Sequence, residues 1–250
     1  MRKTLVGMLS VLMVPAIASA WLAYNDFAWD PTQSTDTNLV TTYFGTSGTP
    51  SGPLKDYATG LNSLVTVTTS GGGTNRVNHG IMPNSGTDAY GYFNGIIDGV
   101  GEWDYGAPDS LIQFTGLNPA YSYNVVLYGN RNNPTYETVA GARVSLYVIE
   151  SADSWVNQHS TGADIVNYSQ VGDAVRITNG YNTVKGWVAR YESIDPGADG
   201  TFTIRVADGG SVGPPRQYVS GMVFEEIVPE PTTLALFGLG GLLLMLRRKK

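Results

Sequence analysis

Apolar and polar residues alternate in several short runs along the chain. In Thr201–Val206 every second residue is apolar, which is the period of a β-strand with one buried face. Comparable runs, rich in Thr, Val, Tyr and Ile, occur at 64–69, 121–128, 143–149, 183–191 and 218–227. A few helical turns are expected only near 49–60. The pattern predicts an almost entirely β-structured protein.

Turn-forming residues separate these runs. They occur at Gly71–Gly73, Leu117–Pro119, Asn130–Pro134, Asn179–Gly180, Asp195–Gly197 and Asp208–Gly210. Many short strands divided by such turns are typical of an antiparallel β-sandwich or jelly roll. Because no linker or fixed-period repeat interrupts residues 21–227, we expect a single all-β domain over that range.

Residues 1–20 have the three parts of a secretory signal peptide. Arg2 and Lys3 are basic, residues 4–17 are apolar and uncharged, and Ala18-Ser19-Ala20 supplies the small residues that signal peptidase accepts. We expect cleavage after Ala20 and export of the remainder. The alternative, a retained N-terminal anchor, needs a longer apolar span.

The C-terminus carries a second targeting segment. Pro229-Glu230-Pro231 precedes an uncharged stretch of 15 residues, which ends at Arg247, Arg248 and two lysines. As a helix the stretch spans about 22 Å, short of a hydrocarbon core of about 30 Å, and the flanking arginines can snorkel to close part of that gap. The positive-inside rule keeps the basic cluster in the cytoplasm and leaves the body of the chain outside.

A Pro-Glu-Pro tripeptide, a short apolar segment and a basic cluster in this order resemble the PEP-CTERM sorting signal, here over residues 228–250. The resemblance implies recognition and processing at Pro229, Glu230 and Pro231, with Arg247 and Arg248 stopping transfer. Its enzyme is exosortase, a membrane-embedded cysteine transpeptidase of Gram-negative bacteria that make exopolysaccharide. The chain would be held transiently in the inner membrane and then reach the cell surface or matrix. A permanent single-span anchor is the alternative.

Composition separates the ends from the body. The chain has 250 residues and no cysteine, which excludes disulfides, thiolate zinc sites and cysteine nucleophiles. Its net charge of −6 is uneven, because six of the 15 basic residues lie at the two ends. Residues 21–228 carry nine basic and 20 acidic side chains, a net charge of −11. Such an acidic body argues against nucleic acid as a partner.

A second resemblance covers roughly residues 110–227. Phe114–Pro119 leads into the predicted strand Tyr121–Tyr128, and Gly200–Ile204 and the apolar run Val219–Ile227 follow. This order is similar to a galactose-binding-like jelly roll found in secreted bacterial proteins, some of them attached to glycan-degrading enzymes. The resemblance implies a fold and no activity, because one fold hosts many functions.

Aromatic residues are the main candidates for ligand contacts. Sugars stack their C–H faces on aromatic rings and take hydrogen bonds from polar neighbours. Six residues suited to glycan binding stand in or beside predicted loops: Trp103, Tyr105, Tyr128, Arg131, Tyr136 and Trp155. Core or rim packing is the alternative role for each.

Catalytic signals are weak. His79 and His159 stand in polar contexts that predict surface loops, and no nucleophile elbow or histidine metal motif is present. Glu102 and Asp104, with Asp98 nearby, could supply the carboxylate pair of a glycosidase, but the surrounding glycines favour a solvated loop.

Calcium is the candidate cofactor of an acidic extracellular β-domain, because it binds oxygen ligands. The candidate ligands are Asp195, Asp199 and Asp208, for which plain Asp-Gly turns are the alternative.

Three functions follow from these patterns. The first is a non-enzymatic exported protein, sorted by exosortase, with a structural or adhesive role at the cell surface or in the exopolysaccharide matrix. The second is a carbohydrate-binding module with a defined glycan pocket. The third, which lacks a supporting motif, is an exported glycan hydrolase.

Overall fold

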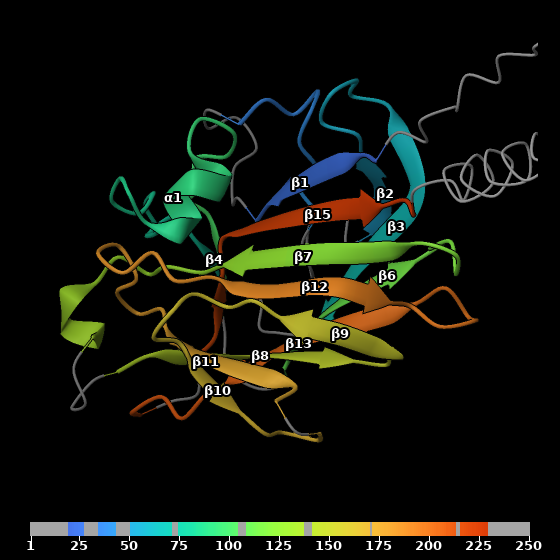
Figure 1. Ribbon diagram of the computed structural model, residues 1–250. Helices are drawn as coiled ribbons and strands as arrows, with labels where there is room; N and C mark the ends of the chain where they lie inside the picture. The colour runs from blue at the N-terminus through green and yellow to red at the C-terminus, as the bar shows by residue number, and fades with distance from the viewer. Residues whose placement is uncertain are drawn as a thin grey trace, which may run out of the picture. The chain divides into compact units, whose positions relative to one another are not determined.

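Two antiparallel sheets face each other across a hydrophobic core (Figure 1). The computed structural model describes residues 20–27, 35–43, 51–71, 75–104, 109–137, 142–170, 172–213 and 216–229. The chain divides into two compact units, Ala20–Ile227 and a second made of Met1–Ser19 with Val228–Lys250. Of the second unit only Val228 and Pro229 are described.

The first sheet has the strand order β1-β15-β7-β12-β9. Its strands are β1 (Leu22–Asp26), β15 (Gly221–Ile227), β7 (Ser122–Tyr128), β12 (Ala189–Asp195) and β9 (Ser154–Asn157). The second sheet has the order β10-β11-β8-β13-β6-β3-β2. Its strands are β10 (Asp164–Val166), β11 (Ala174–Thr178), β8 (Val144–Glu150), β13 (Phe202–Asp208), β6 (Ser110–Thr115), β3 (Asn62–Gly71) and β2 (Ser51–Lys55).

Smaller elements complete the body. A third sheet has the order β14-β5-β4 and consists of β14 (Tyr218–Val219), β5 (Glu102–Asp104) and β4 (Asn75–Val77). The helical elements are α1 (Asp88–Phe93) and the 3-10 turn η1 (Pro134–Tyr136). All strand pairings in the described part are antiparallel, apart from an isolated parallel bridge between Asn25 and Thr41. The predicted all-β sandwich is confirmed.

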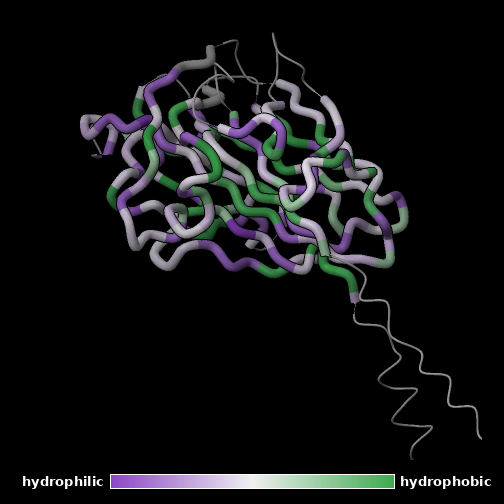
Figure 2. Tube along the Cα trace, turned by 90° about the horizontal axis from the view of Figure 1, so that it is seen from above, coloured by the Kyte–Doolittle hydropathy of each residue, from purple (hydrophilic) through white to green (hydrophobic). Residues whose placement is uncertain are grey.

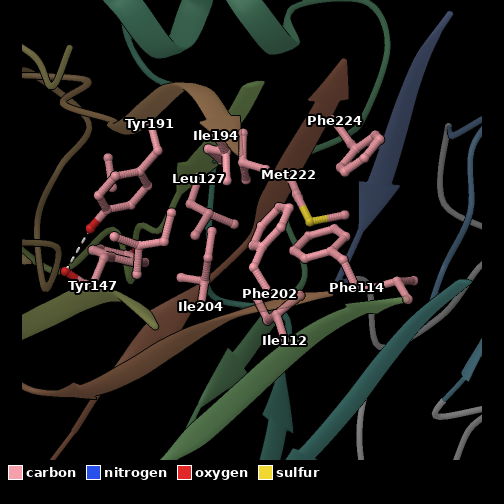
Figure 3. Packing of buried hydrophobic residues seen from close by; sticks show 14 of the residues in the cluster. Ile112, Phe114, Leu127, Tyr147, Tyr191, Ile194, Phe202, Ile204, Met222 and Phe224 are labelled. Carbon is pink, nitrogen blue, oxygen red and sulfur yellow. Dashed lines mark hydrogen bonds between the residues drawn. The ribbon is translucent and has the colours of Figure 1, made fainter. Parts of the chain in front are cut away.

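The main core lies between the two large sheets, where side chains of both interdigitate (Figure 3). Phe224 of β15 stacks on Phe114 of β6 with ring centroids 5.1 Å apart, and Phe114 stacks on Phe202 of β13 at 4.7 Å. All three rings are fully buried. Figure 2 colours the chain by hydropathy and shows hydrophobic segments running through the middle of the body. Buried apolar area of this kind is the dominant favourable term in folding.

A second cluster covers the outer face of the first sheet. Along β7, Leu127 points into the main core, whereas Val126 and Tyr128 point to the opposite face, as strand alternation requires. Phe93 of α1 and the following Ile97 pack on that face. The short helix begins where the Thr87 hydroxyl accepts the amide N–H of Tyr90, an N-cap that satisfies one free donor of the first turn.

Buried asparagines fix the loops that follow β7. Asn182 is fully buried and holds three backbone groups. Its Nδ2 donates to the carbonyls of Gly129 at 3.2 Å and Trp187 at 2.8 Å, and its Oδ1 accepts the Trp187 amide at 2.9 Å. These bonds connect the loop after β7 to the segment that leads into β12.

Asn182→Ala is expected to lower the free energy of unfolding by about 2–4 kcal/mol, because the buried backbone partners lose their hydrogen bonds together. Thermal unfolding of the full-length protein in a mild detergent measures the change. Gln158→Ala is the control, since that side chain is exposed and its loss is expected to cost less than about 0.5 kcal/mol. Equal stability of the two variants would show that the hydrogen bonds of Asn182 do not stabilise the fold.

The helical turns expected near 49–60 are wrong. Residues 51–55 form strand β2, which pairs with β3. Pro53 lacks an N–H donor, yet β2 stands at the edge of its sheet, where one side of the strand needs no partner. Two predicted strands also have different limits in the structure. The run 183–191 becomes strand only from Ala189, and the run 218–227 is divided at Ser220 into β14 and β15.

Candidate functional site

The C-terminal targeting segment begins directly at the end of a core strand. β15 lies between β1 and β7 and pairs with β7 up to its last residue, Ile227, which stands opposite Ser122. Val228 and Pro229 follow with no intervening loop, and Pro229 is exposed. Glu230 and Pro231 lie outside the described residues, as do Arg247 and Arg248. The predicted tripeptide therefore starts two residues after the last residue of β15.

The N-terminal end of the body lies beside this strand. Leu22, the first residue of β1, is paired with Glu225 of β15, and the Glu226 amide donates to the Trp21 carbonyl at 3.0 Å. The predicted cleavage point after Ala20 thus lies next to the strand that leads into the C-terminal segment, whereas Ala18 is outside the described part. The fold therefore pairs the first strand of the body with its last strand, although about 200 residues separate them in the sequence.

Two of the six candidate glycan contacts lie in one loop. Arg131 and Tyr136 both follow β7, and each takes part in a cation–π contact. The Arg131 guanidinium lies 5.8 Å from the centre of the Tyr218 ring, and that of Arg143 lies 5.0 Å from the centre of the Tyr136 ring. Both residues are only partly buried, so this loop remains a candidate contact surface.

Tyr128 and Trp155 are not gathered with them, and the side chains of Trp103 and Tyr105 lie outside the described part. Tyr128 as a ligand contact is wrong, because its side chain is fully buried and its hydroxyl donates to the Ile81 carbonyl at 3.0 Å. Trp155 is partly buried against the main core in β9, at the end of the first sheet opposite to the Arg131 loop. Trp103 belongs to β5, whose side chains lie outside the described part, as does the whole of Tyr105.

His159 has a structural environment rather than the predicted surface-loop setting. Its Nδ1 accepts the Arg190 amide at 2.9 Å, and its ring stands edge-on to the Tyr191 ring at 4.9 Å. Burial lowers the pKa of His159 to about 4, so the imidazole is neutral at pH 7. His79 is exposed, in agreement with the prediction. A neutral imidazole that is occupied with a backbone amide is a poor general base.

The carboxylates predicted to bind calcium each accept hydrogen bonds within their own turn. Asp195 Oδ1 accepts the Gly197 amide at 2.9 Å, and Asp199 accepts the amide and the hydroxyl of Thr201. Asp208 Oδ1 accepts the Ser211 amide at 3.0 Å. Within the described ranges, no three His, Asp or Glu side chains gather as a metal-binding group. These contacts match the alternative role of the three residues, which is to stabilise Asp-Gly turns.

An acidic pair that the sequence did not reveal lies at the end of β1. The Thr35 hydroxyl donates to Asp26 Oδ2 and accepts the Asp98 amide at 3.2 Å, so one threonine joins two carboxylate residues. Asp26 is fully buried. Asp98 was predicted to lie in a solvated loop beside Glu102 and Asp104, but it is partly buried. No motif signals this contact, because 72 residues separate the two acids.

Comparison with known protein families decides the role of the C-terminal segment. Residues 228–249 match the PEP-CTERM protein-sorting motif. This match indicates a protein targeted by exosortase. No curated protein and no solved structure matches the chain, so the galactose-binding-like resemblance of residues 110–227 stays a prediction.

The PEP-CTERM motif starts at Val228, the residue immediately after β15. It implies export and anchoring of the C-terminus at a membrane during sorting. In the part of the chain that the structure describes, no helix has the length and apolar character needed to cross a membrane. The motif and the sandwich are therefore directly adjacent along the chain.

Proposed function

We propose that this protein is exported, processed by exosortase at its PEP-CTERM motif, and delivered to the cell surface or the exopolysaccharide matrix, where its β-sandwich has a structural or adhesive role. The observation that carries the proposal is the motif at residues 228–249, placed directly after the last core strand. Signal peptidase and exosortase are the processing enzymes. The inner membrane holds the chain only until it is cut.

The position of the motif supports processing of a folded body. Removal of the segment beyond Pro229 leaves β15 intact, together with its pairing to β1 and β7. Phe224 and Met222 stay in the main core. Exosortase can thus release the sandwich without removing any residue that packs in its interior.

A non-catalytic role is also part of the proposal. Four of the titratable groups that the sequence offered for chemistry have structural bonds, whereas the side chains of Glu102 and Asp104 lie outside the described part. The His159 ring accepts a backbone amide, and Asp195, Asp199 and Asp208 accept bonds from their own turns. Side chains engaged in this way support the geometry of the fold, which is what a structural or adhesive protein requires.

Replacement of Pro229, Glu230 and Pro231 by alanine tests the sorting step. We expect the unprocessed chain to accumulate in the inner membrane, because the apolar segment stays but its recognition tripeptide is lost. Cell fractionation followed by immunoblotting measures the size and the location of the protein. Asp199→Ala, which removes an exposed carboxylate from a turn of the body, is expected to leave both unchanged.

Mature protein of normal size outside the membrane of the tripeptide variant would contradict the proposal. A matrix pull-down with the wild-type protein tests the role of the sandwich, and retention in the exopolysaccharide fraction is expected. Saturable binding to one defined glycan, lost in Arg131→Ala, would instead favour the carbohydrate-binding module. Turnover of a glycan by the pure protein would contradict the non-catalytic role.

A further inference from the structure

Asp26 and Asp98 are brought together by a single threonine. Asp26 is the last residue of β1, and Asp98 follows α1 by five residues. The Thr35 hydroxyl donates to Asp26 Oδ2 and at the same time accepts the Asp98 amide at 3.2 Å. The second bond on Asp98 is local, since its Oδ1 accepts the Val100 amide at 2.8 Å. Three chain segments therefore meet at this point.

Each of the two carboxylates keeps one buried oxygen without a hydrogen-bond partner. These atoms are Asp26 Oδ1 and Asp98 Oδ2. Asp26 is fully buried, so its free oxygen is shielded from bulk solvent and can meet only ordered water or another bound partner. Buried polar atoms in native proteins almost always have a partner, and an orphaned carboxylate oxygen points to a bound proton, water or ion.

The electrostatics of the pair oppose ionisation in the absence of a counter-charge. Burial raises the pKa of Asp26 to about 7, the Thr35 hydrogen bond opposes this rise, the charge of Asp98 adds to it, and the backbone amide of Asp98 opposes it. Burial also raises the pKa of Asp98. The like charge of Asp98 disfavours ionised Asp26, and a cation bound beside the two groups would offset this repulsion. The net charge of −11 on residues 21–228 favours attraction of a cation to this body.

We propose that Asp26, Thr35 and Asp98 form a binding site for a hard divalent cation, with Ca²⁺ as the best fit. Two carboxylate oxygens and a hydroxyl are oxygen donors, which Ca²⁺ prefers, and water completes its six to eight ligands. The site is separate from the turns of Asp195, Asp199 and Asp208, and it does not depend on the sorting motif. A bound cation would fix the end of the edge strand β1 to the segment after α1.

Thermal unfolding of the full-length protein in a mild detergent, with Ca²⁺ as the only added cation, tests the site. We expect the Tm to rise by about 5–10 °C once Ca²⁺ exceeds its Kd about 100-fold. Titration calorimetry is expected to show one site per chain, with weaker binding of Mg²⁺ because Mg²⁺ demands a stricter geometry. No Tm shift and no heat of binding would overturn the proposal.

Asp26→Asn keeps the shape of the side chain and removes its charge. We expect this variant to lose the Ca²⁺-dependent rise in Tm and to unfold, without Ca²⁺, at a temperature no lower than the wild type. Asp98→Asn provides a second test, should the first variant fold poorly. Asp199→Asn, which neutralises an exposed turn carboxylate, is expected to retain the full response. A response lost in Asp199→Asn and kept in both other variants would place the ion elsewhere and refute the site.

Discussion

Phe224→Ala is expected to lower the free energy of unfolding by about 3–5 kcal/mol, a large part of the about 5–15 kcal/mol that holds a typical domain together. Phe224 is fully buried and its ring centroid lies 5.1 Å from that of Phe114, 5.4 Å from that of Tyr123 and 5.3 Å from that of Trp21. Truncation removes these aromatic contacts and leaves a cavity between the sheets. Denaturant unfolding, followed by tryptophan fluorescence, measures the loss.

Leu64→Ala is the matched control for this substitution. Leu64 is also a large apolar residue of a strand, but its side chain is 91% exposed. We expect its replacement to change the free energy of unfolding by less than about 0.5 kcal/mol. A loss at Phe224 no greater than the loss at Leu64 would show that the contact between β15 and β6 does not form part of the core.

Acidification from pH 7 to pH 4 is expected to remove about 3 kcal/mol of stability through His159 alone. The pKa of His159 in the folded protein is about 4, below the ordinary value of 6.5, because burial disfavours the charged ring. A group with a lowered folded-state pKa stabilises the fold above pH 6.5, and this contribution is lost as the pH falls toward 4. Protonation also places a proton on Nδ1, which accepts the Arg190 amide.

His159→Asn separates this effect from other titrations. The Asn Oδ1 can accept the Arg190 amide, yet the side chain carries no charge at any of these pH values. We expect the variant to be less stable than the wild type at pH 7 and to show a flatter dependence of stability on pH. His79→Asn should keep the wild-type dependence, because His79 is exposed. If the stability of His159→Asn and of the wild type changed with pH in the same way, the pH dependence would not come from His159.

Runs rich in Val, Tyr, Ile and Thr predicted several strands, whether half-exposed or largely buried. The runs 121–128, 143–149 and 201–206 correspond to β7, β8 and β13. β1 was not predicted, since its five residues show no period of two and end in Asn25 and Asp26. Helix α1 was also missed, because it is a single short element that depends on the Thr87 cap and on packing against the first sheet.

The candidate site was predictable only where a contiguous motif encodes it. The PEP-CTERM segment is read from consecutive residues, so its sequence suffices. Tyr128 was misjudged because it is the last residue of the predicted strand, beside a loop, but its side chain lies in the second hydrophobic cluster. The Asp26–Thr35–Asp98 contact arises from the packing of three segments that are distant in the sequence, so no local sequence pattern predicts it.

The place of β15 in the first sheet has a consequence for incomplete chains. The ribosome makes this strand after every other strand of the sandwich, yet β15 is the neighbour of both β1 and β7. A product truncated before Gly221 would leave the backbone donors and acceptors of those two strands open, and open strand edges recruit other chains. A prematurely terminated chain therefore exposes unpaired strand edges, which we expect proteases and chaperones to recognise. The first sheet is therefore complete only when translation has reached the residues just before the sorting motif.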